Sequence, residues 1–99
     1  MEKVRILLES EVKDALHGLP GWSFNNDSLC KMFKFKDFLG SVNFINRMLP
    51  FFEEYRHHPN IHVFYNNVSF DLTSHEYGNK VTSLDTFIAK GIEKEYEKK

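Results

Sequence analysis

The alternation of apolar and polar positions in the first third of the chain predicts a helix followed by two strands. Apolar spacing over residues 12–19, after Ser10 as N-cap, predicts a short helix, and Pro20-Gly21 marks a turn. A short strand is predicted over residues 22–24. From Leu29 to Lys36 apolar and polar residues alternate, which is typical of a strand with one buried face.

The middle of the chain predicts a long helix from Phe38 to about Arg56, with Asp37 as its N-cap. Two apolar stripes, about 100° apart, follow this helix at steps of three and four residues: Phe38, Val42, Ile45, Leu49 and Phe52 form one, and Phe44, Met48, Phe51 and Tyr55 form the other. One stripe suffices to pack a helix on a sheet, so the second is interpreted as a subunit interface. Pro50 is expected to kink the helix or to remove one of its hydrogen bonds.

The last third predicts a β-hairpin and a final helix. Strands over 61–65 and 68–72 flank Asn66-Asn67, a pair that tolerates the positive φ of a two-residue turn. Thr82 and Asp85 have the spacing of a capping box, with Asp in place of the usual Glu. The order helix, strand, strand, helix, strand, strand, helix predicts one α+β domain over residues 1–99, with an antiparallel sheet and its helices on one face.

Composition narrows the function classes. Thirteen Lys and Arg against 14 Asp and Glu leave a formal charge of −1, without the basic excess of a general nucleic-acid or anionic-membrane binder. The one cysteine, Cys30, excludes an internal disulfide and fits a reducing compartment. No apolar run approaches the roughly 18 residues that span a bilayer. We expect a soluble cytoplasmic protein, with a nuclear pool as a second location.

Histidines mark the candidate chemistry, because four of the five lie within residues 57–75. His57-His58-Pro59 follows the long helix, and His75 follows the hairpin. A helix end and a strand end can converge on one rim of the sheet, so three imidazoles could line one cleft. Imidazole suits proton transfer near neutral pH because its reference pKa is about 6.5. Glu53, one helical turn before His57, is expected on the same side, where a carboxylate can bind an amidine-like ring edge.

Simpler interpretations stay open. His57 and His58 could merely cap the C-terminus of the long helix, where positive charge is favoured. A zinc site on three histidines is a lesser alternative, since no Cys accompanies them and no HxxxH spacing occurs. Glu53 could be an ordinary exposed acid, and Asp85 no more than part of the capping box. Nothing near Cys30 indicates an activating partner for its thiol.

Read together, these residues resemble the signature of the pterin-4a-carbinolamine dehydratase family: Glu53, His57-His58-Pro59, Tyr65, His75 and Asp85. The resemblance extends upstream to Leu19-Pro20-Gly21-Trp22 and covers nearly the whole chain. It implies a four-stranded antiparallel sheet with three helices on one face. It also implies homo-oligomers, dimers or tetramers, formed through the helix over residues 38–56, and Pro50 in that helix makes a dimer the preferred expectation.

The implied reaction is loss of water from 4a-hydroxytetrahydrobiopterin to give quinonoid dihydrobiopterin, which recycles the cofactor of aromatic amino acid hydroxylases. The pterin is the substrate, no cofactor or metal is implied, and functional coupling to a hydroxylase is expected. By resemblance the catalytic residues are His57, His58 and His75, with His57 and His75 as the acid–base pair and His58 chiefly orienting the pterin. Implied substrate contacts are Glu53, Arg56, His57, His58, Thr73, Ser74, His75 and Glu76, and Pro59, Tyr65 and Asp85 complete the signature.

The alternative function is a non-catalytic dimerisation or coactivator module, because some family members bind the dimerisation helices of a transcription factor. Three histidines gathered in one cleft distinguish the two hypotheses, since a purely structural module does not need them. The chain departs from common family patterns at Ile61, where an aromatic residue is usual. The segment from His75 to Asp85 is also one residue longer than in the vertebrate type. Neither a nucleic acid nor a membrane is an expected partner.

Overall fold

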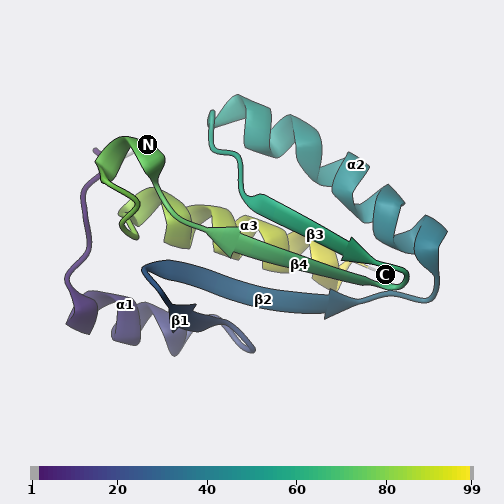
Figure 1. The fold of residues 1–99 in the computed structure, drawn as a ribbon, viewed down its shortest axis with the longest axis horizontal. Helices are drawn as coiled ribbons and strands as arrows, with labels where there is room; N and C mark the ends of the chain where they lie inside the picture. Colours follow the sequence, from purple (N-terminus) through teal and green to yellow (C-terminus); the bar gives the residue numbers. More distant parts are fainter. Residues whose placement is uncertain (1–2, 99) are drawn as a thin grey trace.

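A computed structural model, which describes residues 3–98, shows an antiparallel sheet with helices packed against one face (Figure 1). The elements in chain order are α1 (Glu9–Leu16), β1 (Ser23–Asn25), β2 (Ser28–Lys34), α2 (Phe38–Glu54), β3 (Asn60–Phe64), β4 (Asn67–Leu72), the 3₁₀ helix η1 (His75–Tyr77) and α3 (Ser83–Glu97). The strands lie in the order β1-β2-β4-β3, and all neighbours are antiparallel. The predicted fold class and element order are confirmed.

The core lies between the helices and the two central strands. The strands contribute alternate residues, as a sheet with one buried face requires: Leu29 and Phe33 from β2, and Val68, Phe70 and Leu72 from β4. The helices contribute Val12, Phe44, Met48, Phe52, Ile88 and Ile92. Phe33 lies at the centre, with its ring centroid 4.7–6.1 Å from those of Trp22, Phe44, Phe70 and Tyr96. A core of this kind fixes the orientation of each helix on the sheet.

The two apolar stripes of α2 do not divide as predicted, because Phe52 of the stripe assigned to the sheet is buried together with Phe44 and Met48 of the other. Phe44 and Met48, assigned to a subunit interface, are buried in the core. Phe51 packs on α3 so closely that a Cβ at Gly91 would come 2.3 Å from its ring. The stripe assigned to the sheet is the more exposed one, with Leu49 44% and Phe38 54% exposed. Periodicity alone could not decide which of two equivalent stripes faces the sheet. Ser41 is also buried, so the core-facing side of α2 includes a polar residue.

Two local predictions are wrong in detail. The first helix begins at Glu9 with Leu8, not Ser10, as its N-cap residue, because the Glu11 carboxylate accepts the Leu8 N–H at 2.9 Å. In the hairpin, Phe64 pairs with Asn67, so the two turn residues are Tyr65 and Asn66. Tyr65, not an asparagine, has the positive φ, 49°. Its carbonyl accepts the Ser41 hydroxyl at 2.9 Å, a tertiary contact that stabilises this conformation.

Other predicted boundaries agree closely with the structure. Asp37 caps α2 by accepting the Gly40 N–H at 2.8 Å, and the helix continues through the exposed Pro50. No helix within residues 3–98 is long and apolar enough to cross a membrane. At the left of Figure 1, the C-terminal end of α2, the end of β4 and the start of α3 lie together. The sequence-predicted histidines follow two of these three element ends.

Candidate active site

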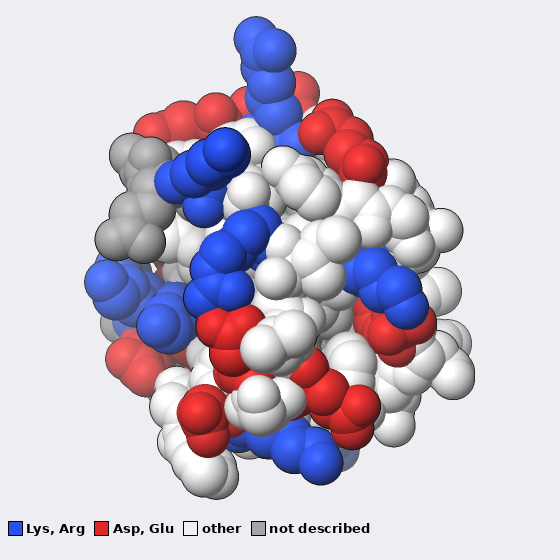
Figure 2. Space-filling view, turned by 90° about the vertical axis from the view of Figure 1, so that its left-hand side faces the viewer, with Lys and Arg blue, Asp and Glu red and all other residues white. Residues whose placement is uncertain are grey.

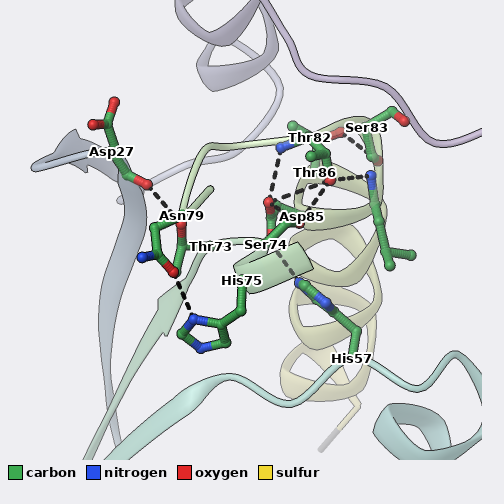
Figure 3. Close-up of polar contacts among 11 residues, drawn as sticks. Asp27, His57, Thr73, Ser74, His75, Asn79, Thr82, Ser83, Asp85 and Thr86 are labelled. Atoms are coloured by element: carbon green, nitrogen blue, oxygen red, sulfur yellow. Dashed lines mark hydrogen bonds and ion pairs between the residues drawn. The ribbon is translucent and has the colours of Figure 1, made fainter. Parts of the chain in front are cut away.

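The centre of the site is the carboxylate of Asp85, which is completely buried in the first turn of α3 (Figure 3). One oxygen, Oδ2, accepts the backbone N–H of Thr82 at 2.8 Å and the Ser74 hydroxyl at 2.9 Å. The Thr82 side chain in turn accepts the Leu84 N–H at 3.2 Å, so the predicted capping box is confirmed. A carboxylate at a helix N-terminus is favourably placed with respect to the helix dipole. The capping box therefore also holds a buried carboxyl group in a defined orientation.

His57 binds the other oxygen of this carboxylate. Its Nε2–H donates to Oδ1 of Asp85 at 2.5 Å, and the residue is only 8% exposed. The ring reaches Asp85 because α2 ends at Glu54 and Arg56 then adopts a φ of +49°. A positive φ is strained for a residue with a Cβ, and such strain clusters at functional sites. The His57 side chain thus does more than cap α2, because it connects the end of that helix to the start of α3.

His58 lies on the exposed side of the same segment. Its Nε2 donates to the carboxylate of Glu53, and both side chains are about two-thirds exposed. Glu53 was expected on the same side of the helix as His57, which follows it by one helical turn. Because α2 ends at Glu54, the helical spacing does not extend to His57, and the Glu53 carboxylate pairs with His58. Exposed ion pairs contribute little to stability, so this pair leaves Glu53 and His58 available for other partners.

His75 begins the 3₁₀ helix η1, directly after β4 and Ser74. Its Nδ1–H donates to the side-chain carbonyl of Asn79 at 2.6 Å, and the residue is exposed. Two residues before His75, Thr73 donates its hydroxyl to the Asp27 carbonyl in the β1–β2 turn at 2.9 Å. His75 is therefore positioned by a short loop that is anchored to a neighbouring turn. Figure 3 shows this loop beside the Asp85 network.

The structure brings most of the predicted site residues to one end of the sheet. His57 and Ser74 share the Asp85 carboxylate, and His75 follows Ser74 in the chain. Ser74 was assigned a substrate contact, but its side chain is buried against Asp85 and Thr82. A contact from its backbone stays a prediction. Arg56, Thr73 and Glu76 lie on the same segments as the histidines, and Pro59 leads from His58 into β3.

Tyr65 is separate from this cluster. It lies in the β3–β4 turn, at the opposite end of the hairpin from the β4 end that leads to His75, and it is 67% exposed. The structure therefore gives it a place in the turn, where its φ is positive, and not in the cluster. Asn79 and Asp27, by contrast, were missed from the sequence. The Gly78-Asn79 pair after His75 was a usable signal, because both residue types favour the positive φ that they adopt here, 71° and 60°.

The electrostatic surroundings show no dominant sign and no metal site. Figure 2 presents the face at this end of the molecule, where Lys and Arg side chains alternate with Asp and Glu. Within residues 3–98, no three His, Cys, Asp or Glu side chains come together as a metal site would require. Cys30 lies on the central strand β2, where burial and the neighbouring Asp71 raise its pKa to about 11. Its thiol is therefore protonated near neutral pH and is not an activated nucleophile.

Comparison with known proteins shows the family of the chain. Residues 5–95 match the family model for pterin 4 alpha carbinolamine dehydratase. A protein of Sulfolobus acidocaldarius, which has a provisional name as a pterin-4-alpha-carbinolamine dehydratase, is 43% identical over 87% of this chain and 93% of its own length. One from Thermosynechococcus vestitus with the same provisional name is 40% identical over 87% of this chain and 90% of its own.

A solved structure has a similar fold. The crystal structure of a transcriptional coactivator/pterin dehydratase from Brucella melitensis matches with a TM-score of 0.87 and 33% identity, over 93% of this chain and 99% of that one. The chain belongs to the pterin-4a-carbinolamine dehydratase family. The resemblance stated from the residues alone is confirmed.

Proposed function

We propose that the protein is a dehydratase that converts a 4a-hydroxytetrahydropterin, such as 4a-hydroxytetrahydrobiopterin, to the quinonoid dihydropterin and water. In this reaction the N5–H bond and the C4a–O bond break, a C4a=N5 double bond forms, and the hydroxyl leaves with a proton as water. One group must accept a proton and another must donate one. General acid–base catalysis of this kind contributes about 10²–10⁴-fold to a rate.

The observation that carries the proposal is the pair of imidazoles beside the start of α3, each bound through only one of its ring nitrogens. Asp85 binds Nε2 of His57, and Asn79 binds Nδ1 of His75. The second nitrogen of each ring has no hydrogen-bond partner among residues 3–98. These two nitrogens are the proposed proton donor and acceptor. A ring held at one nitrogen and unoccupied at the other is the arrangement that proton transfer to a substrate requires.

His58 is proposed as a substrate-orienting residue, because it lies next to His57 and is exposed together with Glu53. A carboxylate can accept two parallel hydrogen bonds from the amidine-like edge of a pterin ring. Further contacts are proposed for Arg56, Thr73, Glu76 and the backbone of Ser74. In cells that contain a pterin-dependent aromatic amino acid hydroxylase, the reaction would recycle its cofactor.

The proposal is tested by stopped-flow absorbance, with the carbinolamine generated in place by a hydroxylase. Catalytic amounts of the native protein should speed carbinolamine loss over the rate in buffer. The His57→Ala/His75→Ala double variant should not, although its circular dichroism spectrum should match that of the native protein. Native protein that gives no acceleration would refute the dehydratase proposal.

The exposed stripe on α2 favours a second property, self-association. Phe38 and Leu49 of this stripe and the adjacent Leu39 are all at least 44% exposed, and exposed apolar patches mark interaction surfaces. We propose that this stripe forms a dimer, and it is also the surface that a coactivator function would use. Leu49→Glu should convert the dimer to monomer in sedimentation without unfolding it, whereas Phe51→Glu, against Gly91, should destabilise the fold. A monomeric native protein, or a dimer unchanged by Leu49→Glu, would contradict this interface.

A further inference from the structure

The two imidazoles of the site are held through different nitrogens. His57 donates from Nε2 to a carboxylate at 2.5 Å, whereas His75 donates from Nδ1 to an amide carbonyl at 2.6 Å. A neutral imidazole carries one proton, so the nitrogen that donates determines which nitrogen keeps a lone pair. Neutral His57 therefore accepts through Nδ1, and neutral His75 accepts through Nε2. With these donors the two neutral rings are opposite tautomers, each favoured by its own partner.

The backbone of the loop places the Asn79 side chain at the Nδ1 edge of the His75 ring. Its φ of +60° belongs to the left-handed region that asparagine tolerates better than most residues. Its N–H donates to the Ser74 carbonyl at 3.0 Å, and the Ser74 N–H donates to the Lys80 carbonyl at 3.0 Å. These two backbone hydrogen bonds close the loop around η1. The Asn79 side chain is thus presented to His75 by a structured turn.

The loop is also anchored from outside. Lys80 pairs with the side chain of Asp27 at 3.2 Å, while Thr73 donates to the Asp27 backbone carbonyl at 2.9 Å. Asp27 lies in the β1–β2 turn and itself has a φ of +59°. Both ends of the segment that carries His75 and Asn79 are therefore held by the same turn. Because both ends of the loop are held, few loop conformations separate the His75 ring from the Asn79 side chain.

We propose that Asn79 is a positioning residue which holds His75 as the Nδ1–H tautomer, so that Nε2 is the atom that accepts the N5 proton of the substrate. The catalytic part of this inference rests on the proposed function. An imidazole in water prefers the opposite tautomer, with its proton on Nε2. Without the Asn79 carbonyl, most neutral His75 rings would present a donor where the reaction needs an acceptor. A histidine in the wrong tautomer is a poor general base even when its position is unchanged.

The test is ¹⁵N NMR of protein labelled at histidine, recorded at a pH at which the rings are neutral, because the ring-nitrogen shifts identify the tautomer. Native His75 should be protonated at Nδ1. Asn79→Gly removes the acceptor while glycine accommodates the positive φ, and it should shift His75 to protonation at Nε2. Asn79→Asp keeps an acceptor oxygen and should retain the native tautomer. Tyr65→Gly is the matched control, because Tyr65 also has a positive φ, 49°, but lies in the β3–β4 turn at the other end of the hairpin.

The kinetic readout separates positioning from a merely structural role. Asn79→Gly should lower kcat about tenfold with KM changed less than about twofold, since the ring stays in place but carries its proton on the wrong nitrogen. Asn79→Asp should retain more activity than Asn79→Gly, and Tyr65→Gly should match the native protein. Native His75 protonated at Nε2, or Asn79→Gly with native kcat, would overturn the inference. Native protein without dehydratase activity but with His75 protonated at Nδ1 would refute the proposed function and leave the tautomer assignment supported.

Discussion

The two histidines of the proposed acid–base pair lie in contrasting surroundings. His57 is buried and binds a buried carboxylate that also caps α3, so the same contacts hold the site and the fold together. His75 is exposed, on a loop that is anchored to a neighbouring turn, and its ring is bound by Asn79 of the same loop. Substitutions on the His57 side should therefore affect both stability and activity. Substitutions on the His75 side should affect activity alone.

The largest expected effect on activity is that of His75→Ala. Removing a general base should lower kcat about 10²–10⁴-fold. The free energy of unfolding should change by less than about 0.5 kcal/mol, because the side chain is exposed. Stopped-flow rates and urea denaturation measure the two quantities, with His62→Ala on the open face of the sheet as control. An unfolded His75→Ala variant would show that the loop stabilises the fold, and it would contradict the difference between the His57 and His75 sides of the site.

Asp85→Ala should have the largest effect on stability. It leaves the Thr82 N–H, the Ser74 hydroxyl and the His57 ring without their acceptor, and each buried unsatisfied donor costs about 1–3 kcal/mol. We expect a loss of at least about 3 kcal/mol in the free energy of unfolding. Urea denaturation measures it, with Asp14→Ala on the exposed side of α1 as control. A loss below about 1 kcal/mol would mean that the buried network does not stabilise the fold.

Much of the fold and of the candidate site could be predicted from the sequence. The parts that could not be predicted depend on tertiary contacts or on loop conformation. The capping box and the hairpin depend on residues close in sequence, so spacing alone predicted them. The His57–Asp85 contact joins residues 28 apart, and nothing local indicates it. Likewise, two equivalent stripes on α2 could be distinguished only by what packs against them. Asn79 was missed because its role depends on a loop conformation and not on a sequence period.

A smaller effect is expected from Glu53→Gln, which removes the charge facing His58. Exposed ion pairs contribute about 0–1 kcal/mol, so stability should be nearly unchanged. The proposed pterin-binding role predicts a KM raised several-fold with little change in kcat, measured by initial rates against pterin concentration. Glu54→Gln, at an exposed neighbouring position, is the control and should leave KM at its native value. An unchanged KM for Glu53→Gln would remove Glu53 from the proposed binding site.

The smallest effect is expected in the N-terminal segment. This segment is bound to the start of α3, near Asp85, because the Ser83 N–H donates a hydrogen bond to the Arg5 carbonyl at 2.9 Å. The Arg5 guanidinium, followed by the Leu8 N–H, lowers the pKa of Glu11 from 4.5 to about 2. A lowered carboxyl pKa stabilises the fold above the unfolded-state pKa, and this contribution is lost as the pH falls through the folded-state value.

Native protein should therefore be more stable than Glu11→Gln near pH 7, and the difference should shrink between about pH 4.5 and 2. Thermal unfolding of both proteins across this range measures it. A difference that stays constant with pH would mean that Glu11 does not carry the effect through its charge.

The central claim, that His57 and His75 act together in one dehydration, is tested most directly by carbinolamine loss in a double-mutant cycle. The account predicts that native protein accelerates the loss. Each single alanine variant should lose nearly as much rate as the double variant, since residues that act as a unit are non-additive. Two independent losses that multiply in the double variant, or native protein no faster than buffer, would contradict it.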